Sequence, residues 1–178
     1  MRRLMIALTV AAAAYGLPVS AQRSTHIALG GGVAVPVGKF GDGYELGPQG
    51  IVSLITGAPE SPFGFRLDYS YNGFRGNVIG GDVRAAGTHI NSLTANLVFT
   101  GRAGAFKPYA VGGGGWYPYR EGGQSQRTNA FGLNGGLGLG FPIPYTQIGG
   151  FIEGRYHAAY ASQHLDRRFV PISLGLMF

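Results

Sequence analysis

Residues 63–72 read FGFRLDYSYN, a stretch in which apolar and polar side chains alternate without interruption. One set contains Phe63, Phe65, Leu67, Tyr69 and Tyr71, and the other contains Gly64, Arg66, Asp68, Ser70 and Asn72. Side chains two residues apart share one face of a β-strand, whereas a helix repeats every ~3.6 residues. The stretch therefore predicts a strand with an apolar medium on one side and a partly charged, polar space on the other.

Seven further segments of similar length end at glycine, proline or asparagine. We expect the eight strands at residues 25–36, 47–56, 62–72, 88–100, 107–119, 129–141, 148–157 and 168–178. The second segment, GPQGIVSLIT, alternates poorly, so the sequence does not show which of its faces is which. The connections between segments are alternately long and short, which is typical of a meander with tight turns on one side of a membrane and loops on the other.

These segments have the length that a tilted strand needs to cross a bilayer. A sheet crosses lipid only when it closes and leaves no edge unpaired. The sequence thus predicts an all-β fold, an eight-stranded antiparallel up-and-down transmembrane β-barrel. Aromatic residues gather where segments end, as expected for rings at the two membrane interfaces. They are Phe40, Tyr44, Tyr69, Tyr71, Phe74, Trp116, Tyr117, Tyr119, Phe141, Tyr145, Tyr156 and Tyr160.

The composition supports a surface that does not face water. Only 12% of the 178 residues are charged, and 33 are glycine, whereas soluble domains have about 25% charged residues. The chain has no cysteine, so an exported form has no disulfide framework.

The N-terminus has the layout of a secretory signal peptide. Residues 1–21, MRRLMIALTVAAAAYGLPVSA, begin with two arginines, continue with an apolar stretch and end in small residues. The apolar stretch is shorter than the ~20 residues of a spanning helix. We therefore expect Sec-type export, cleavage after Ala21 and one barrel domain over residues 22–178. Cleavage removes two of the 14 basic residues and none of the eight acidic ones, so the net charge falls from +6 to +4.

The mature chain resembles the small eight-stranded outer-membrane β-barrel family, which includes the OmpA-like transmembrane domain. The resemblance lies in GGGVAVPVGKFGDGYELGPQG at 30–50, in FIEGRYH at 151–157 and in the terminal phenylalanine. It implies a monomer in the outer membrane of a Gram-negative-type bacterium, in contact with lipid and lipopolysaccharide and without a cofactor. It also implies that Phe178, with Leu176 and Leu174, is the signal that the barrel assembly machinery recognises.

Charged residues within the predicted strands form two pairs, each with a spacing of two: Arg66 with Asp68, and Glu153 with Arg155. The third and seventh strands of an eight-stranded barrel face each other across the lumen, so these four side chains are expected to form ion pairs inside. An arginine on the lipid face costs ~2–4 kcal/mol at mid-depth. The expected role is to fill and order the lumen; a gated, porin-like polar conduit is the alternative.

Two other classes of protein share features with this sequence. A secreted, soluble lipocalin-like barrel that binds a small apolar ligand would turn the same alternation inward, and parity alone does not fix the direction. A hydrolase of the lipid A deacylase type would use His157, Ser162, His164 and Asp166 near the outer rim. The deacylase pattern His-x-Ser-Asn is absent at His157, because Ala158 and Ala159 follow this histidine and leave the serine position empty. We therefore predict that the protein is not an enzyme.

Other ligands have little support in the sequence. His26 and His89 lack a second metal ligand at a suitable spacing, and no glycine run completes a phosphate-binding motif. Basic residues are scattered, which argues against nucleic acid. Charges in the long connections could contact lipopolysaccharide or an extracellular ligand, or keep the loops solvated. They are Lys39, Arg75, Arg84, Arg120, Arg127, Arg167 and Arg168, with Asp42, Glu45, Asp82, Glu121 and Asp166.

Overall fold

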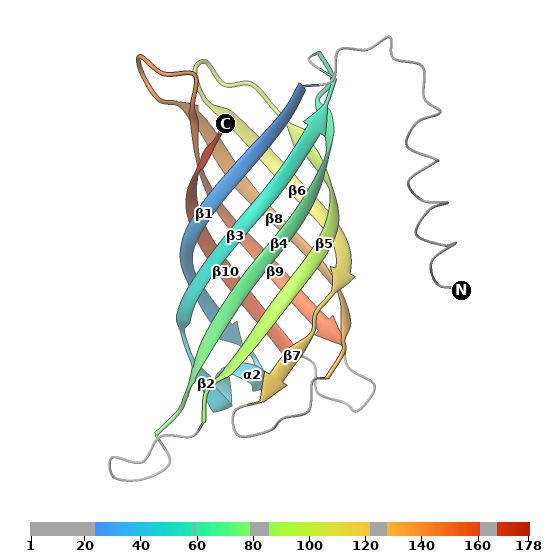
Figure 1. The fold of residues 1–178 in the computed structure, drawn as a ribbon, viewed down its shortest axis with the longest axis vertical. Coiled ribbons are helices and arrows are strands. Elements are labelled where there is room, and N and C mark those ends of the chain that lie inside the picture. The colour runs from blue at the N-terminus through green and yellow to red at the C-terminus, as the bar shows by residue number, and fades with distance from the viewer. Residues whose placement is uncertain (1–23, 59, 79–85, 122–127, 161–166) are drawn as a thin grey trace, which may run out of the picture.

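The computed structural model describes residues 24–58, 60–78, 86–121, 128–160 and 167–178. Its long strands are β1 (Ser24–Val37), β3 (Gly47–Gly57), β4 (Phe63–Gly76), β5 (Thr88–Thr100), β6 (Lys107–Trp116), β8 (Phe131–Pro142), β9 (Gly149–Tyr160) and β10 (Arg167–Met177). Each pairs antiparallel with its neighbours along the chain, and β10 pairs with β1, so the sheet closes (Figure 1). The predicted eight-stranded up-and-down barrel is confirmed. The predicted signal peptide, residues 1–21, lies outside the described residues.

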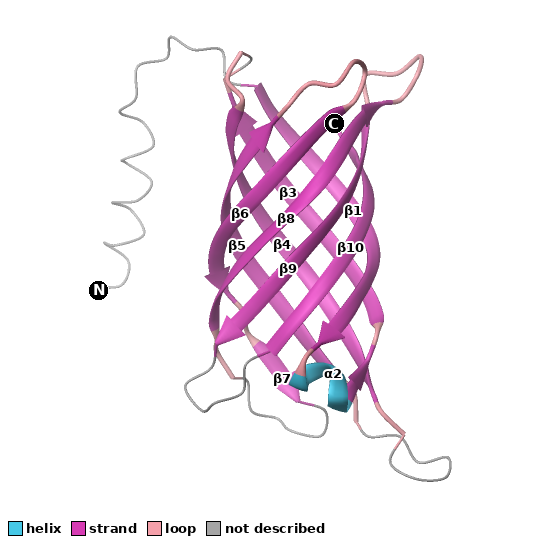
Figure 2. Cartoon of the chain, turned by 180° about the vertical axis from the view of Figure 1, so that it is seen from behind, coloured by secondary structure: helices cyan, strands magenta, loops and turns pink. Residues whose placement is uncertain are grey.

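Three short elements lie together at one end of the barrel, here called the long-loop end (Figures 1 and 2). They are the helix α2 (Lys39–Gly43), strand β2 (Tyr44–Glu45), which pairs with β4, and strand β7 (Tyr119–Glu121), which pairs with β5. The C-terminus, residues 60–62 and the connections 101–106 and 143–148 lie at the opposite, short-turn end. Within the described part of the chain, no helix has the length and apolar character to cross a membrane.

The apolar side chains of the strands point outward. On β4, Phe63 and Phe65 are 62% and 67% exposed, whereas Arg66 and Asp68 are 4% and 1% exposed. A lipocalin-like barrel would have the opposite arrangement, with its apolar side chains around an inner ligand. The structure therefore shows that the apolar faces of the strands point outward, which parity alone did not fix. This direction argues against the soluble ligand-carrier alternative.

The poor alternation of β3 has a local cause. Gln49, Ile51 and Ser53 face inward and are buried, whereas Val52 and Leu54 are exposed on the outer face. The inward Ile51 packs with Ala28 and Phe151 in a small apolar cluster inside the barrel. Apolar residues thus occur on both faces of this strand, which hides its period in the sequence.

Candidate functional site

Four charged side chains from two opposite strands meet inside the barrel, and we call them the charge cluster: Arg66 and Asp68 on β4, and Glu153 and Arg155 on β9. Within each strand, Arg66 Nε lies 2.6 Å from Asp68 Oδ1, and Arg155 Nε lies 2.7 Å from Glu153 Oε1. Across the lumen, Arg66 Nη1 lies 2.6 Å from Glu153 Oε2, and Arg155 Nη1 lies 2.8 Å from Asp68 Oδ2. The four charges alternate in sign, so each is compensated within the cluster.

Polar side chains from four other strands hold the charge cluster in place. The hydroxyl of Ser53 on β3 accepts hydrogen bonds from Arg66 Nη2 at 3.0 Å and Nε at 3.2 Å. Tyr109 on β6 donates its hydroxyl to Glu153 Oε2 at 2.9 Å. Asn96 on β5 donates to Asp68 Oδ2 at 2.8 Å, and Asn134 on β8 accepts from Arg155 at 3.3 Å. Desolvated charges need such additional hydrogen bonds, because their mutual attraction alone rarely offsets the loss of water.

These four partners were not predicted as site residues from the sequence. A signal was available for Asn96 and Asn134, because each lies on the polar or glycine-rich face of a strand whose other face is apolar. Asn134, for example, is two residues from Gly132 and Gly136 on the glycine-rich face of β8. The face of these two residues was therefore readable, whereas its inward direction depends on closure of the sheet and the specific partner depends on the register between strands.

A second cluster closes the lumen toward the long-loop end, and we call it the aromatic plug: Phe40, Phe74, Tyr117, Tyr119 and Phe169. The rings of Phe40 and Phe74 meet edge to face at 4.9 Å between centroids, and Phe74 meets Phe169 at 5.5 Å. The guanidinium of Arg167 lies 4.0 Å from the centroid of the Tyr119 ring and 5.2 Å from that of Phe40. These contacts fill the barrel where α2 folds over its end.

The aromatic plug corrects two expectations. Phe40, Phe74, Tyr117 and Tyr119 were expected at a membrane interface, but each is at most 6% exposed. Phe74 shares the parity of Arg66 and Asp68 on β4, so its strand position turns it inward. Arg167 was counted among the loop charges, but it is buried at the start of β10. Arg84, Arg127, Asp82 and Asp166 lie outside the described residues.

His157 lies between the charge cluster and the aromatic plug. Its ring stacks on Phe169 at 4.9 Å between centroids, and its Nδ1 lies 3.0 Å from the hydroxyl of Tyr117. The hydrolase alternative needs this histidine near the outer rim, but it is buried within β9. Ser162 and His164, the other members of that hypothetical set along with Asp166, lie outside the described residues.

The other two histidines of the strands have ordinary neighbours. His26 Nδ1 lies 3.2 Å from the carbonyl oxygen of Phe178, and the ring of His89 stacks on Tyr71 at 6.0 Å. Among the residues that the structure describes, no group of three or more His, Asp or Glu side chains is arranged to hold a metal ion.

The C-terminal residue completes the barrel. Phe178 N donates to the carbonyl oxygen of Ile27 at 2.8 Å, and Ile27 N donates to the oxygen of Phe178 at 3.1 Å. The side chains of Phe178, Leu176 and Leu174 all point outward, with 50%, 42% and 60% of their surface exposed. The last strand therefore presents one apolar face to the surroundings while its backbone closes the sheet.

Glycine on the inner face of β8 is required by close strand approach, which gives a first prediction. A Cβ on Gly136 would lie 2.6 Å from Arg155 Cγ and closer still to the carbonyl oxygen of Gly154. Gly136→Ala is therefore expected to lower the free energy of unfolding by about 1–3 kcal/mol, through strain against backbone. Urea unfolding in phospholipid vesicles measures the change.

The adjacent glycine supplies the matched control. A Cβ on Gly135 would meet only the carbonyl oxygen of Val111, at 3.8 Å, which is an ordinary contact. Gly135→Ala should therefore leave stability within about 0.5 kcal/mol of the parent protein. Equal effects of the two alanines would contradict the close approach at Gly136.

Comparisons with known proteins agree with this architecture. No protein-family model and no curated protein matches the chain. The fold is similar to that of Neisserial surface protein A, NspA, with a TM-score of 0.65 and 13% identity over 87% of this chain and 97% of that one. It is similar to the outer membrane protein OprG from Pseudomonas aeruginosa, with a TM-score of 0.53 and 15% identity over 89% and 98%. It is also similar to the Yersinia pestis outer membrane protein Ail, solved in a phospholipid bilayer nanodisc. The TM-score is 0.51, and the identity is 16% over 87% of this chain and 100% of that one.

Proposed function

We propose that this chain is a monomeric barrel of the outer membrane of a Gram-negative-type bacterium, with a structural or surface-contacting role and no catalytic activity. The observation that carries the proposal is the outer face of the barrel. Leu137, Phe131 and Phe65 are 71%, 70% and 67% exposed, and apolar side chains of this kind occur on all eight long strands. Soluble monomers seldom expose apolar patches beyond a few hundred Å². Lipid around the barrel would supply the missing apolar medium.

The outward aromatic side chains lie near both ends of the strands, which supports a band of lipid between them. Phe63 and Tyr71 on β4 are both exposed and are separated by eight residues. At ~3.3 Å per residue and a tilt of ~40°, they lie roughly 20 Å apart along the barrel axis, against ~25 Å for the apolar band of such barrels. Exposed rings toward the long-loop end include Tyr71, Trp116, Phe131 and Tyr160, and those toward the short-turn end include Phe63, Phe99, Phe106 and Phe178.

In this proposal the lumen of the barrel does not conduct ions or small solutes. Eight strands enclose room for side chains or one small ligand, and not for an open channel. Here the charge cluster crosses the lumen from Arg66 to Glu153, and the aromatic plug lies beyond it toward the long-loop end. These two layers argue against the porin-like conduit that the charged pairs also allowed.

The proposed partners follow from two surfaces of the barrel, the outer face of the last strand and the long-loop end. The outward apolar set of Phe178, Leu176 and Leu174 suits recognition of the last strand by the barrel assembly machinery. Lys39, Arg75 and Arg120 are exposed near the long-loop end, where they are available to lipopolysaccharide phosphates or to an extracellular ligand. Both termini of the mature chain would then face the periplasm.

Cell fractionation of the expressed protein tests the proposal. We expect the chain in outer membranes, with a mature N-terminus at Gln22 by mass spectrometry. We also expect a change in gel mobility when the sample is boiled, because boiling unfolds the barrel. Recovery in the soluble periplasmic fraction, with the same mobility before and after boiling, would refute a membrane barrel.

A further inference from the structure

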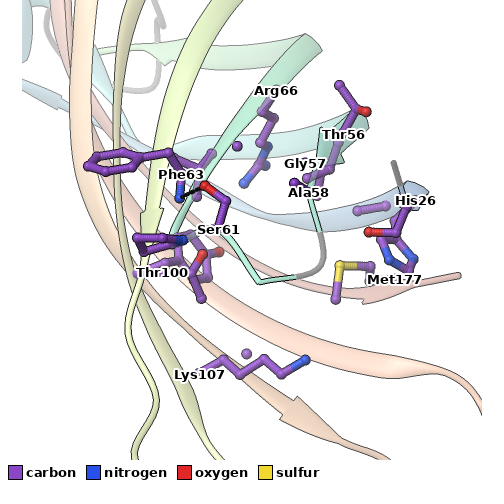
Figure 3. A pocket seen from close by; sticks show the side chains of 18 of the residues that line it. His26, Thr56, Gly57, Ala58, Ser61, Phe63, Arg66, Thr100, Lys107 and Met177 are labelled. Atoms are coloured by element: carbon purple, nitrogen blue, oxygen red, sulfur yellow. Dashed lines mark hydrogen bonds between the residues drawn. The ribbon is translucent and has the colours of Figure 1, made fainter. Parts of the chain in front are cut away.

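A cavity of about 400 Å³ opens at the short-turn end of the lumen, and we call it the vestibule. Its volume lies within the ~300–1,000 Å³ that is usual for small-molecule sites. Figure 3 shows Arg66, His26, Met177 and Lys107 around this hollow, with the ring of Phe63 turned away from it. Its apolar lining comprises Ala28, Ile55, Val98, Phe151 and Met177.

The mouth of the vestibule has an excess of positive charge. Arg102, in the connection 101–106, and Lys107, at the start of β6, both line it and are exposed. Neither of them forms an ion pair with any residue that the structure describes. The acidic residue among the lining side chains is Glu60, so two cations face one carboxylate there. An anionic group is therefore favoured at the mouth.

The inner end of the vestibule has the opposite preference. Arg66 reaches it, but its guanidinium already binds Asp68, Glu153 and Ser53. The two carboxylates beside this arginine would repel a further anion. The guanidinium also lies 6.0 Å from the centroid of the Phe151 ring, which covers one side of it. The inner part of the cavity therefore favours an apolar group.

We propose that the vestibule binds a single-chain amphiphile with a carboxylate head, the chemical class of the fatty acids. The chain would pack against Val98, Phe151 and Met177, and the carboxylate would lie at the mouth near Arg102 and Lys107. This binding proposal does not rest on the structural role proposed above, because it depends only on the cavity and its charges.

Binding of decanoate to the full protein in phospholipid nanodiscs tests the proposal. Equilibrium dialysis with labelled decanoate, corrected with empty nanodiscs, is expected to show one saturable site. Octanoate, which is two methylenes shorter, should bind about fifteenfold more weakly, because each buried methylene contributes about fourfold. Decanol, which lacks the charge, should bind at least about fivefold more weakly than decanoate. Uptake no greater than that of empty nanodiscs, or equal affinity for the acid and the alcohol, would overturn the proposal.

Two pairs of variants locate the ligand within the vestibule. Arg102→Gln with Lys107→Gln should weaken decanoate binding about fivefold, whereas Lys39→Gln with Arg75→Gln removes the same charge at the other end and should not. Val98→Trp fills the cavity and should abolish binding, whereas Leu97→Trp, on the outer face, should not. The mobility shift on boiling verifies that each variant is folded. Because the glutamine variants change only exposed side chains, unchanged binding in Arg102→Gln with Lys107→Gln would by itself contradict the site.

Discussion

Arg66→Met is expected to lower the free energy of unfolding by about 3–5 kcal/mol, one of the two largest effects foreseen for a single substitution in this barrel. The methionine removes the guanidinium that bridges Asp68 and Glu153, whose side chains are each 2% exposed. Two buried carboxylates then lose one of their two shared partners and keep only Arg155, and the hydroxyl of Ser53 loses both of its hydrogen bonds from Arg66. Reversible urea unfolding in phospholipid vesicles, followed by fluorescence of the single tryptophan, Trp116, measures the change.

Arg75→Met is the matched control on the same strand. Arg75 is exposed near the end of β4, so its loss should change stability by no more than about 0.5 kcal/mol.

Combining Arg66→Met with Glu153→Met removes both members of one ion pair and leaves Asp68 bound to Arg155. The double variant should therefore cost less than the sum of the two single variants, by about 0.5–3 kcal/mol. Strictly additive losses below 1 kcal/mol each would contradict a charge cluster that stabilises the barrel.

Strands and their faces were largely predictable because the period of two is a local property. The expected segment 88–100 coincides with β5, and the alternation of residues 63–72 reappears as the exposed and buried faces of β4. What parity could not supply is the medium on each side. Phe63 pointing outward is a property of the closed sheet, since only closure defines an inside.

Helix α2 and the aromatic plug were not predicted, because their causes are tertiary. The helix has five residues, two of them glycine, and no side chain caps its N-terminus. Its buried Phe40 packs against Phe74, which lies far along the chain. Arg167 looked like a loop charge for the same reason: only the folded barrel brings its guanidinium over the rings of Tyr119 and Phe40.

Leu137→Arg is expected to lower the free energy of unfolding by about 2–4 kcal/mol in phospholipid vesicles, because Leu137 points outward near the middle of β8. An arginine at that depth must leave water and enter the hydrocarbon. The fraction that migrates as the folded band in unboiled samples, measured along a urea titration, reports the change. In water the same substitution at an exposed site would cost almost nothing.

Phe131→Arg makes this test specific for lipid. Phe131 is 70% exposed and Leu137 is 71% exposed, so the two sites differ in depth and hardly in solvent contact. Phe131 begins β8 beside Trp116, toward the long-loop end, where the cost of an arginine falls to about 0–1 kcal/mol. A larger loss at Leu137 than at Phe131 would follow the polarity profile of a bilayer. Equal and small losses at both positions would mean that the outer face is not embedded in lipid, and the membrane proposal would then be wrong although the barrel itself is closed.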